Sequence, residues 1–193
     1  MTIAEQKRQL RLTSRSLVQE LDPHLRARCS EQIREKLTQL QAFRQSNLIL
    51  GFIPNKIEPD IGSIYDLAFQ LGKSVAFPRC ESAGSMQFFA MEPDWRDRIV
   101  RGRFPVYEPD PSYHVPVDLS SYEQVLILVP ALAFTPHRRR LGRGKGYYDR
   151  FLAQRIAHAH MVGVCFSTQI LAEIPFESHD MVVDIVVTET HIY

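Results

Sequence analysis

The sequence has few cysteines, no long hydrophobic run and almost no net charge. Its three cysteines, Cys29, Cys80 and Cys165, lie far apart and form no CxxC pair, which argues against a disulfide framework or a zinc cluster. The longest apolar run, around residues 125–132, is much shorter than the roughly 20 residues of a membrane-spanning helix. Because no apolar signal segment opens the chain either, we expect a cytoplasmic protein with no membrane partner.

The charge balance points to no polyanionic macromolecule. Lys and Arg number 23 against 22 Asp and Glu, a net charge of +1, so the average charge gives no reason to expect a nucleic-acid partner. Hydrophobic residues make up 45% of the chain and charged residues 23%, proportions typical of folded proteins. With 193 residues, the chain is expected to form one domain over 1–193 and to be a monomer.

The N-terminal fifth has the local signals of two helices. Thr2 and Glu5 have the spacing of a capping box, and leucines recur at helical intervals afterwards, which predicts a helix over 3–21. Asp22 followed by Pro23 is typical of a helix start, and the apolar spacing after it predicts a second helix to about Phe43.

Beyond residue 45 the apolar residues form short runs typical of buried strands. These runs cover residues 48–53, 74–77, 125–129, 161–166 and 182–187. Helices are predicted between them at 60–71, with Asp60 as cap and Gly72 as stop, and at 147–159. An antiparallel strand is expected over 85–91, and the prolines of 105–116 predict an irregular stretch. The alternation predicts an α/β three-layer sandwich with a mainly parallel central sheet and an N-terminal helical segment.

A glycine-rich segment carries most of the chemical information. Gly142, Gly144 and Gly146 alternate with Arg143 and Lys145 just before a predicted helix. Glycines let backbone N–H groups converge on an anion, and a following helix start favours negative charge. The pattern therefore suits a polyphosphate, which Lys binds as a point charge and Arg as a forked donor.

The segment matches neither of two common phosphate-binding motifs. A P-loop needs Ser or Thr after GK, where Gly146 stands, and a dinucleotide fingerprint needs glycine at the position of Tyr147. A turn with solvated charges is the plainer interpretation of such a loop. However, five cations fall within 138–145, the local net charge is +5 over 138–150, and it is +3 over 1–15. This concentration favours anion binding.

The same residues resemble the signature of the 5-formyltetrahydrofolate cyclo-ligase family. The resemblance is strongest over 140–149, RLGRGKGYYD, preceded by VPALAF at 129–134. Further matches are KRQLR at 7–11, IEPD at 57–60, FPR at 77–79 and HDMVVD at 179–184, so the similarity extends over nearly the whole chain.

The resemblance implies an enzyme that uses ATP and Mg²⁺ to close 5-formyltetrahydrofolate, with or without a polyglutamate tail, to 5,10-methenyltetrahydrofolate. ATP would phosphorylate the formyl oxygen, N10 would attack the activated carbon, and ADP and phosphate would be released. Such chemistry depends on positioning and charge neutralisation and needs no covalent nucleophile from the protein.

The resemblance also implies a role for particular residues. Lys145 and Arg143 would act on the transferred phosphoryl group, Asp149 and Asp180 would hold Mg²⁺, and Ile53, Glu58 and Tyr147 would bind the substrate. The nucleotide would be bound by Lys7, Arg8, Gln9, Leu10, Arg11, Arg140, Leu141, Gly142, Arg143, Gly144, Lys145, Gly146, Tyr147 and Tyr148.

Each assignment has a structural alternative. The cations at 7, 11 and 15 form one helix face that solvent alone could cover, and Glu58 could be a surface carboxylate. Asp149 could interact with a helix dipole, Asp180 could be a turn residue, and the tyrosines could pack at the core or its rim. His158 and His160 are interpreted as surface residues, and Met86, Phe88 and Phe89 as core.

Three positions depart from the family pattern, and two other functions stay open. Thr135 stands where Asp is usual, Arg139 where a turn glycine is common, and Ile61 where Thr is usual. One alternative function is a phosphotransferase acting on another small acceptor. The other is an RNA- or ribosome-binding module whose basic patch would be 138–150.

Overall fold

The computed structural model describes all residues except 82–83, 103, 105, 113–114, 155 and 157. Helix α1 (Ile3–Gln19) begins at the predicted capping box, with Thr2 and Glu5 each accepting the other's backbone N–H. Helix α2 (Pro23–Gln39) begins where Asp22 accepts two backbone N–H groups. The single helix predicted to Phe43 is interrupted, because Leu40 is extended (ψ 138°) and a short α3 (Gln41–Gln45) follows it.

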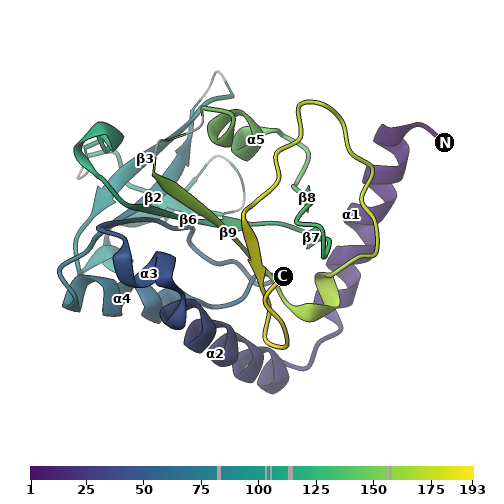
Figure 1. Cartoon of the computed structure of the whole chain (residues 1–193), viewed down its shortest axis with the longest axis horizontal. Coiled ribbons are helices and arrows are strands. Elements are labelled where there is room, and N and C mark those ends of the chain that lie inside the picture. The colour runs from purple at the N-terminus through teal and green to yellow at the C-terminus, as the bar shows by residue number, and fades with distance from the viewer. Residues whose placement is uncertain (82–83, 103, 105, 113–114, 155, 157) are drawn as a thin grey trace.

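A six-stranded sheet forms the centre of the molecule (Figure 1). Its strand order is β10-β9-β6-β1-β2-β3, parallel throughout except for the antiparallel pairing of β3 with β2. The strands are β1 (Leu48–Leu50), β2 (Ser74–Cys80), β3 (Met86–Met91), β6 (Val125–Pro130), β9 (Ala159–Val164) and β10 (Ile185–Val187). The mainly parallel α/β sheet and the antiparallel strand near 85–91 are thus confirmed.

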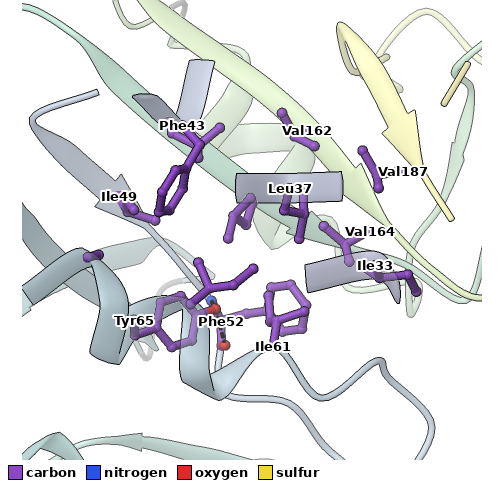
Figure 2. Close-up of a cluster of buried hydrophobic side chains, with 14 of the residues drawn as sticks. Ile33, Leu37, Phe43, Ile49, Phe52, Ile61, Tyr65, Val162, Val164 and Val187 are labelled. Carbon is purple, nitrogen blue, oxygen red and sulfur yellow. Dashed lines mark hydrogen bonds between the residues drawn. The ribbon is translucent and has the colours of Figure 1, made fainter. Parts of the chain in front are cut away.

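Helices cover both faces of this sheet. Helices α2, α3 and α4 (Gly62–Gln70) lie on one face, and α5 (Tyr147–Leu152) lies on the other (Figure 1). Ile33, Leu37 and Phe43 pack against alternate strand residues such as Ile49 and Val164, as Figure 2 shows. The residues between those positions form a second buried cluster with α5. This alternation explains why the strands read as continuous apolar runs.

Two predicted helices differ from the observed ones. Helix α4 starts at Gly62 rather than at 60, and its N-cap is Ile61, so the prediction of Asp60 as the cap was wrong. Asp60 instead accepts the Gly62 N–H at 3.0 Å from one residue outside the cap, and the helix stops before Gly72 (φ 71°), as predicted. Helix α5 ends at Leu152 rather than Ala159, because His158 takes a left-handed φ of 58° and strand β9 already begins at Ala159. The predicted start of this helix directly after the glycine-rich segment is confirmed, since α5 begins at Tyr147 with Gly146 as its N-cap.

Smaller elements complete the chain. Two hairpins, β4 (Ile99–Arg101) with β5 (Tyr107–Pro109) and β7 (Ala133–Phe134) with β8 (Arg140–Leu141), stand apart from the main sheet. The stretch predicted as irregular thus contains β5, while Pro105 lies outside the described residues. Short 3₁₀ turns occur at Trp95–Asp97 (η1), Leu119–Ser121 (η2) and Ser167–Gln169 (η3). Within the described chain, no helix is long and apolar enough to cross a bilayer.

The strand order creates a crevice beside β1. From β1 the chain proceeds to β2 on one side, whereas β6 occupies the other side. Open α/β sheets bind ligands where the order reverses, outside the carboxyl ends of the strands. Here Phe52 and Ile53 follow β1, and Pro130 and Ala131 stand at the corresponding end of β6.

Candidate functional site

A cavity of about 310 Å³ lies at this reversal of strand order, a volume at the lower end of the range for small-ligand sites. Phe52, Ile53, Pro130 and Ala131 form part of its wall. The glycine-rich segment 142–146 forms another part. A wider cleft of about 920 Å³ adjoins the cavity and shares Ile53, Asn55, Val106, Tyr107 and Arg143 with it. The cavity therefore has an apolar side, a cationic side and an open extension.

The glycine-rich segment follows the β7–β8 hairpin and runs into α5. Gly144 (φ 91°) and Gly146 (φ 69°) have left-handed backbones, which side chains adopt only at a cost. Contacts around Gly142 are also tight, since a Cβ there would lie 2.8 Å from Arg140 Nη1. These constraints leave Lys145 exposed at the tip of the loop, where it lines the cavity.

Two arginines of the segment are paired with carboxylates. Arg140, whose side chain is 3% exposed, donates to Asp149 at 2.7 Å. Arg143 donates to Glu58 at 2.8 Å, and the Glu58 side chain is 7% exposed while Arg143 is 37% exposed. Glu58 is thus largely buried in the cavity wall. This overturns the alternative that it is a surface carboxylate.

Helix α1 lies beside the C-terminal segment (Figure 1), and two of its predicted nucleotide-binding residues contact that segment and the glycine-rich loop without lining the cavity themselves. Lys7 is buried and donates to Glu177 at 2.8 Å and to Asp180 at 2.5 Å. Arg11 is half-buried, and its Nε donates to the Gly142 carbonyl at 2.9 Å. A purely solvated helix face is therefore wrong for these two residues.

The other predicted residues of α1 lie elsewhere. Arg8 and Gln9 are exposed, and Leu10 packs with Leu141 in a small apolar cluster. None of these three residues lines the cavity, so their nucleotide contacts stay predictions. Arg15, two turns after Arg8, lines the cavity although it is an exposed residue.

The two predicted magnesium ligands lie on segments that contact each other. Asp149 Oδ1 accepts from Arg140 and from the Met181 N–H, at 2.7 and 3.3 Å. Asp180 Oδ2 accepts from Lys7 and from the Glu177 N–H. Burial alone would raise the pKa of Asp180, but these hydrogen bonds outweigh it and lower the pKa below its ordinary value. Asp149 therefore does more than interact with a helix dipole, and Asp180 does more than form a turn, because each pairs with a cationic side chain.

The predicted substrate residues line the cavity together. Ile53, Glu58 and Tyr147 all belong to its wall, as does Tyr148, which was predicted to bind the nucleotide. The Tyr147 ring packs at its edge against Phe104, with centroids 5.8 Å apart. Burial raises the pKa of Tyr148, so its hydroxyl stays protonated. The two tyrosines pack at the rim of the core and also form part of the cavity wall. The packing role and the ligand-binding role predicted from the sequence are therefore compatible.

Three polar atoms of the cavity wall are buried without a partner. Among the described residues, four buried side-chain polar atoms make no hydrogen bond, and Asn55 Nδ2, Arg140 Nε and Tyr148 Oη are three of them. Unsatisfied buried polar groups are rare and costly. Their concentration around one cavity marks this wall as the candidate contact surface for a polar ligand.

Three residues of this region were not predicted from the sequence. Glu177 joins Asp180 at Lys7, and its carboxylate, Asp180 and His179 have ligand atoms within 4.8 Å of one another. Glu108 lines the cavity, and its burial raises the pKa of its carboxyl. Asn55 lines both the cavity and the cleft. Of these, only Glu177 had a sequence signal, because it lies three residues before Asp180.

The remaining sequence interpretations concern residues around the site. His158 and His160 are exposed, as predicted. Met86, Phe88 and Phe89 are buried core residues, as predicted, although Met86 also lines the cavity.

The three departures from the family pattern have structural roles. Thr135 is buried, and its hydroxyl accepts the Arg139 N–H at 3.2 Å inside the β7–β8 turn. The left-handed residue of that turn is Arg138 (φ 66°) rather than Arg139. Arg139 instead stacks on Phe176, 5.2 Å from its centroid. Ile61 is fully buried in the core beneath α4.

Comparisons with known proteins agree with these features. A "Probable 5-formyltetrahydrofolate cyclo-ligase" of Caenorhabditis elegans is 28% identical over 97% of this chain and 94% of its own length. The 5-formyltetrahydrofolate cyclo-ligase of Mycolicibacterium smegmatis is 34% identical over 72% of each chain. The NMR structure of Aquifex aeolicus 5,10-methenyltetrahydrofolate synthetase superposes with a TM-score of 0.78 at 27% identity. It covers 100% of this chain and 92% of the other.

The family model described as the 5-formyltetrahydrofolate cyclo-ligase family matches residues 3–189. That range contains the whole sheet, helix α1 and every residue of the cavity wall described above. The chain belongs to the 5-formyltetrahydrofolate cyclo-ligase family.

Proposed function

We infer that this protein catalyses the ATP-dependent cyclisation of 5-formyltetrahydrofolate to 5,10-methenyltetrahydrofolate. One observation carries the inference beyond family membership. Glu58, from the loop after β1, contacts Arg143 of the glycine-rich segment at 2.8 Å in one cavity. The reaction requires the folate and the polyphosphate to come into contact. Glu58 is the residue assigned to the folate, and Arg143 is assigned to the polyphosphate.

The reaction proceeds in two steps. The formyl oxygen takes the γ-phosphoryl group of ATP, which releases ADP and turns a poor leaving group into phosphate. N10 then bonds to the formyl carbon and loses its proton, and the C–O bond breaks to release phosphate. The conjugated methenyl bridge remains as a cation.

Charge neutralisation by this chain supports the first step. Lys145 stands exposed at the loop tip and lines the cavity, so its ammonium is placed as a point charge for the transferred group. Arg143 adds a forked donor next to Glu58. Arg11, held on the Gly142 carbonyl, adds a third cation to the same loop. Such positioning and electrostatic stabilisation are the main sources of rate in phosphoryl transfer.

The carboxylates at 149 and 180 fit a magnesium ion. Each has one oxygen engaged by protein donors, which leaves its second oxygen for a metal. Mg²⁺ uses one or two protein carboxylates together with phosphate oxygens. When bound, the ion would neutralise phosphate charge, while Arg140 and Lys7 hold the two carboxylates in place.

An absorbance assay tests this function. Purified protein mixed with 5-formyltetrahydrofolate should produce the near-ultraviolet band of the methenyl product only when ATP and Mg²⁺ are both present. Folded protein that yields no band would refute the proposal. Accumulation of a phosphorylated acceptor without free phosphate would instead indicate a phosphotransferase.

Compartment and assembly are part of the same proposal. Cys29, Cys80 and Cys165 are free thiols in the structure, which fits a reducing compartment such as the cytoplasm. A relative from Arabidopsis thaliana is named as mitochondrial, so fractionation is the deciding measurement. Light scattering tests the predicted monomer, and a comparison of mono- and polyglutamylated substrate tests tail preference.

A further inference from the structure

Asn55 is tied into the loop that holds Glu58. Its backbone N–H donates to Glu58 Oε2 at 3.1 Å, and its backbone carbonyl accepts the Glu58 N–H at 3.0 Å. Its side-chain Oδ1 accepts the Ile57 N–H at 3.0 Å. These three bonds place the Asn55 amide beside the Glu58 carboxylate. They also identify the side-chain oxygen as the acceptor, so the NH₂ group is the end without a partner.

The NH₂ group of Asn55 is buried and unsatisfied. Nδ2 makes no hydrogen bond although it is shielded from solvent, and Asn55 lines both the cavity and the adjoining cleft. Leaving a buried donor without an acceptor costs the free energy of its lost hydration. A bound molecule with a hydrogen-bond acceptor would satisfy the donor once a small shift of the surrounding wall side chains exposes Nδ2 to the cavity.

Donor and acceptor requirements identify which part of the substrate fits. Glu58 offers acceptors, and one of its oxygens also pairs with Arg143. The edge of a pterin ring carries the 2-amino and N3–H donors next to the C4 carbonyl acceptor. A carboxylate beside an amide N–H is complementary to that edge. We propose that Asn55 determines substrate specificity by donating through Nδ2 to the 4-oxo group of the pterin, beside Glu58. This rests on the proposed function, because Glu58 is assigned to the pterin there.

The variant Asn55→Asp separates this role from a structural one. An aspartate oxygen can still accept the Ile57 N–H, so the loop is kept, but the donor becomes a second acceptor. Affinity for 5-formyltetrahydrofolate should fall at least tenfold, whereas the KM for ATP should change less than threefold. The variant should also bind the analogue with an amino group in place of the 4-oxo group better, relative to the natural substrate. We expect this preference ratio to shift at least 30-fold from wild type.

The chain offers a matched control in its other asparagine. Asn47 Oδ1 also accepts a backbone N–H, that of Gln124, at the opposite end of β1 from the cavity. Asn47→Asp should leave both affinities and their ratio unchanged.

The outcomes distinguish the two proposals. Equilibrium binding of both ligands is measured for wild type and both variants, alongside thermal unfolding. If folded Asn55→Asp has the same preference ratio between the two ligands as wild type, the proposed role of Asn55 is overturned. The proposed function is still upheld in that case if the wild type forms the methenyl product. A wild type that binds 5-formyltetrahydrofolate but never forms the methenyl product would refute the function, and the ratio would still decide the role of Asn55. A wild type that does not bind 5-formyltetrahydrofolate would overturn both.

Discussion

Replacing Lys7 with methionine should destabilise the protein strongly, because it strands a buried carboxylate. The Lys7 and Asp180 side chains are 8% and 13% exposed, and their charged atoms lie 2.5 Å apart. Removing one partner of a buried ion pair costs about 3–5 kcal/mol. Glu177 is 40% exposed, so solvent screens its share, and we take about 3 kcal/mol from the low end of that range.

The loss can be read as a shift in melting temperature. For a chain of this size, 1 kcal/mol corresponds to about 2–4 °C, so Lys7→Met should melt about 6–12 °C below wild type. Arg8→Met is the control, since Arg8 is the exposed neighbour on the same helix and should change the midpoint by less than about 2 °C. Adding Asp180→Asn to Lys7→Met should recover part of the loss. Equal melting temperatures for Lys7→Met and Arg8→Met would refute this reasoning.

The pH dependence provides a second test of the same pair. Hydrogen bonds lower the pKa of Asp180 below 3.8 despite its burial, so its contribution is present above that value and is lost as pH falls through the folded-state pKa. The same carboxylates raise the pKa of Lys7 above 10.5, although burial lowers it. Its contribution is therefore present below 10.5 and is lost as pH rises through the folded-state pKa. The difference in melting temperature between wild type and Lys7→Met should therefore be largest at pH 7. It should shrink towards zero at strongly acidic and at strongly alkaline pH.

Three further variants, two of them with a matched control variant, test the loop and the cavity wall. Lys145→Ala should lower kcat about 100- to 1,000-fold with little change in melting temperature. The control Lys73→Ala removes hydrogen bonds to the carbonyls of Arg44 and Ser46, so it should lower the melting temperature with little change in kcat. Equal losses of stability and activity in Lys145→Ala would contradict the role of Lys145. Gly146→Ala and Gly72→Ala impose similar left-handed strain, at φ 69° and 71°, and each should cost about 1 kcal/mol. Only the former should impair turnover in the assay, because its Cβ would lie 2.7 Å from Arg150. Burial raises the pKa of Glu108 above 4.5, so its ionisation weakens folding as pH rises through that region. Glu108→Gln should gain melting temperature relative to wild type as pH rises above 4.5, and a pH-independent difference would argue against this.

Local signals in the sequence were sufficient for most of the fold. The capping box at Thr2 and the Asp22–Pro23 start depend on neighbouring residues, so they could be predicted without tertiary information. The strands could be predicted because both faces of the sheet are covered, which makes the central strand positions almost continuously apolar. The break at Leu40 and the early end of α5 had no comparable local signal. Both depend on how the chain must turn to reach the next strand.

Without the family resemblance, the site was predictable from residue pattern only where one segment carries it. The glycine-rich loop and its flanking residues are contiguous, so their composition alone indicated phosphate binding. The contacts of Lys7 with Glu177 and of Arg143 with Glu58 join residues 170 and 85 positions apart. No spacing rule predicts such pairs. Asn55 was missed because its significance is an unsatisfied donor, which only the three-dimensional structure reveals.

The joining of Lys7 to Asp180 has a consequence for synthesis of the protein. Helix α1 leaves the ribosome early, whereas the acidic residues that hold it are made more than 170 residues later. Until they appear, the buried position of Lys7 has no counter-charge, and Arg11 has no fixed place against the glycine-rich loop. A nascent chain can therefore form much of its sheet before α1 docks. Nucleotide binding should be acquired late in synthesis, at the stage when the C-terminal segment closes over α1.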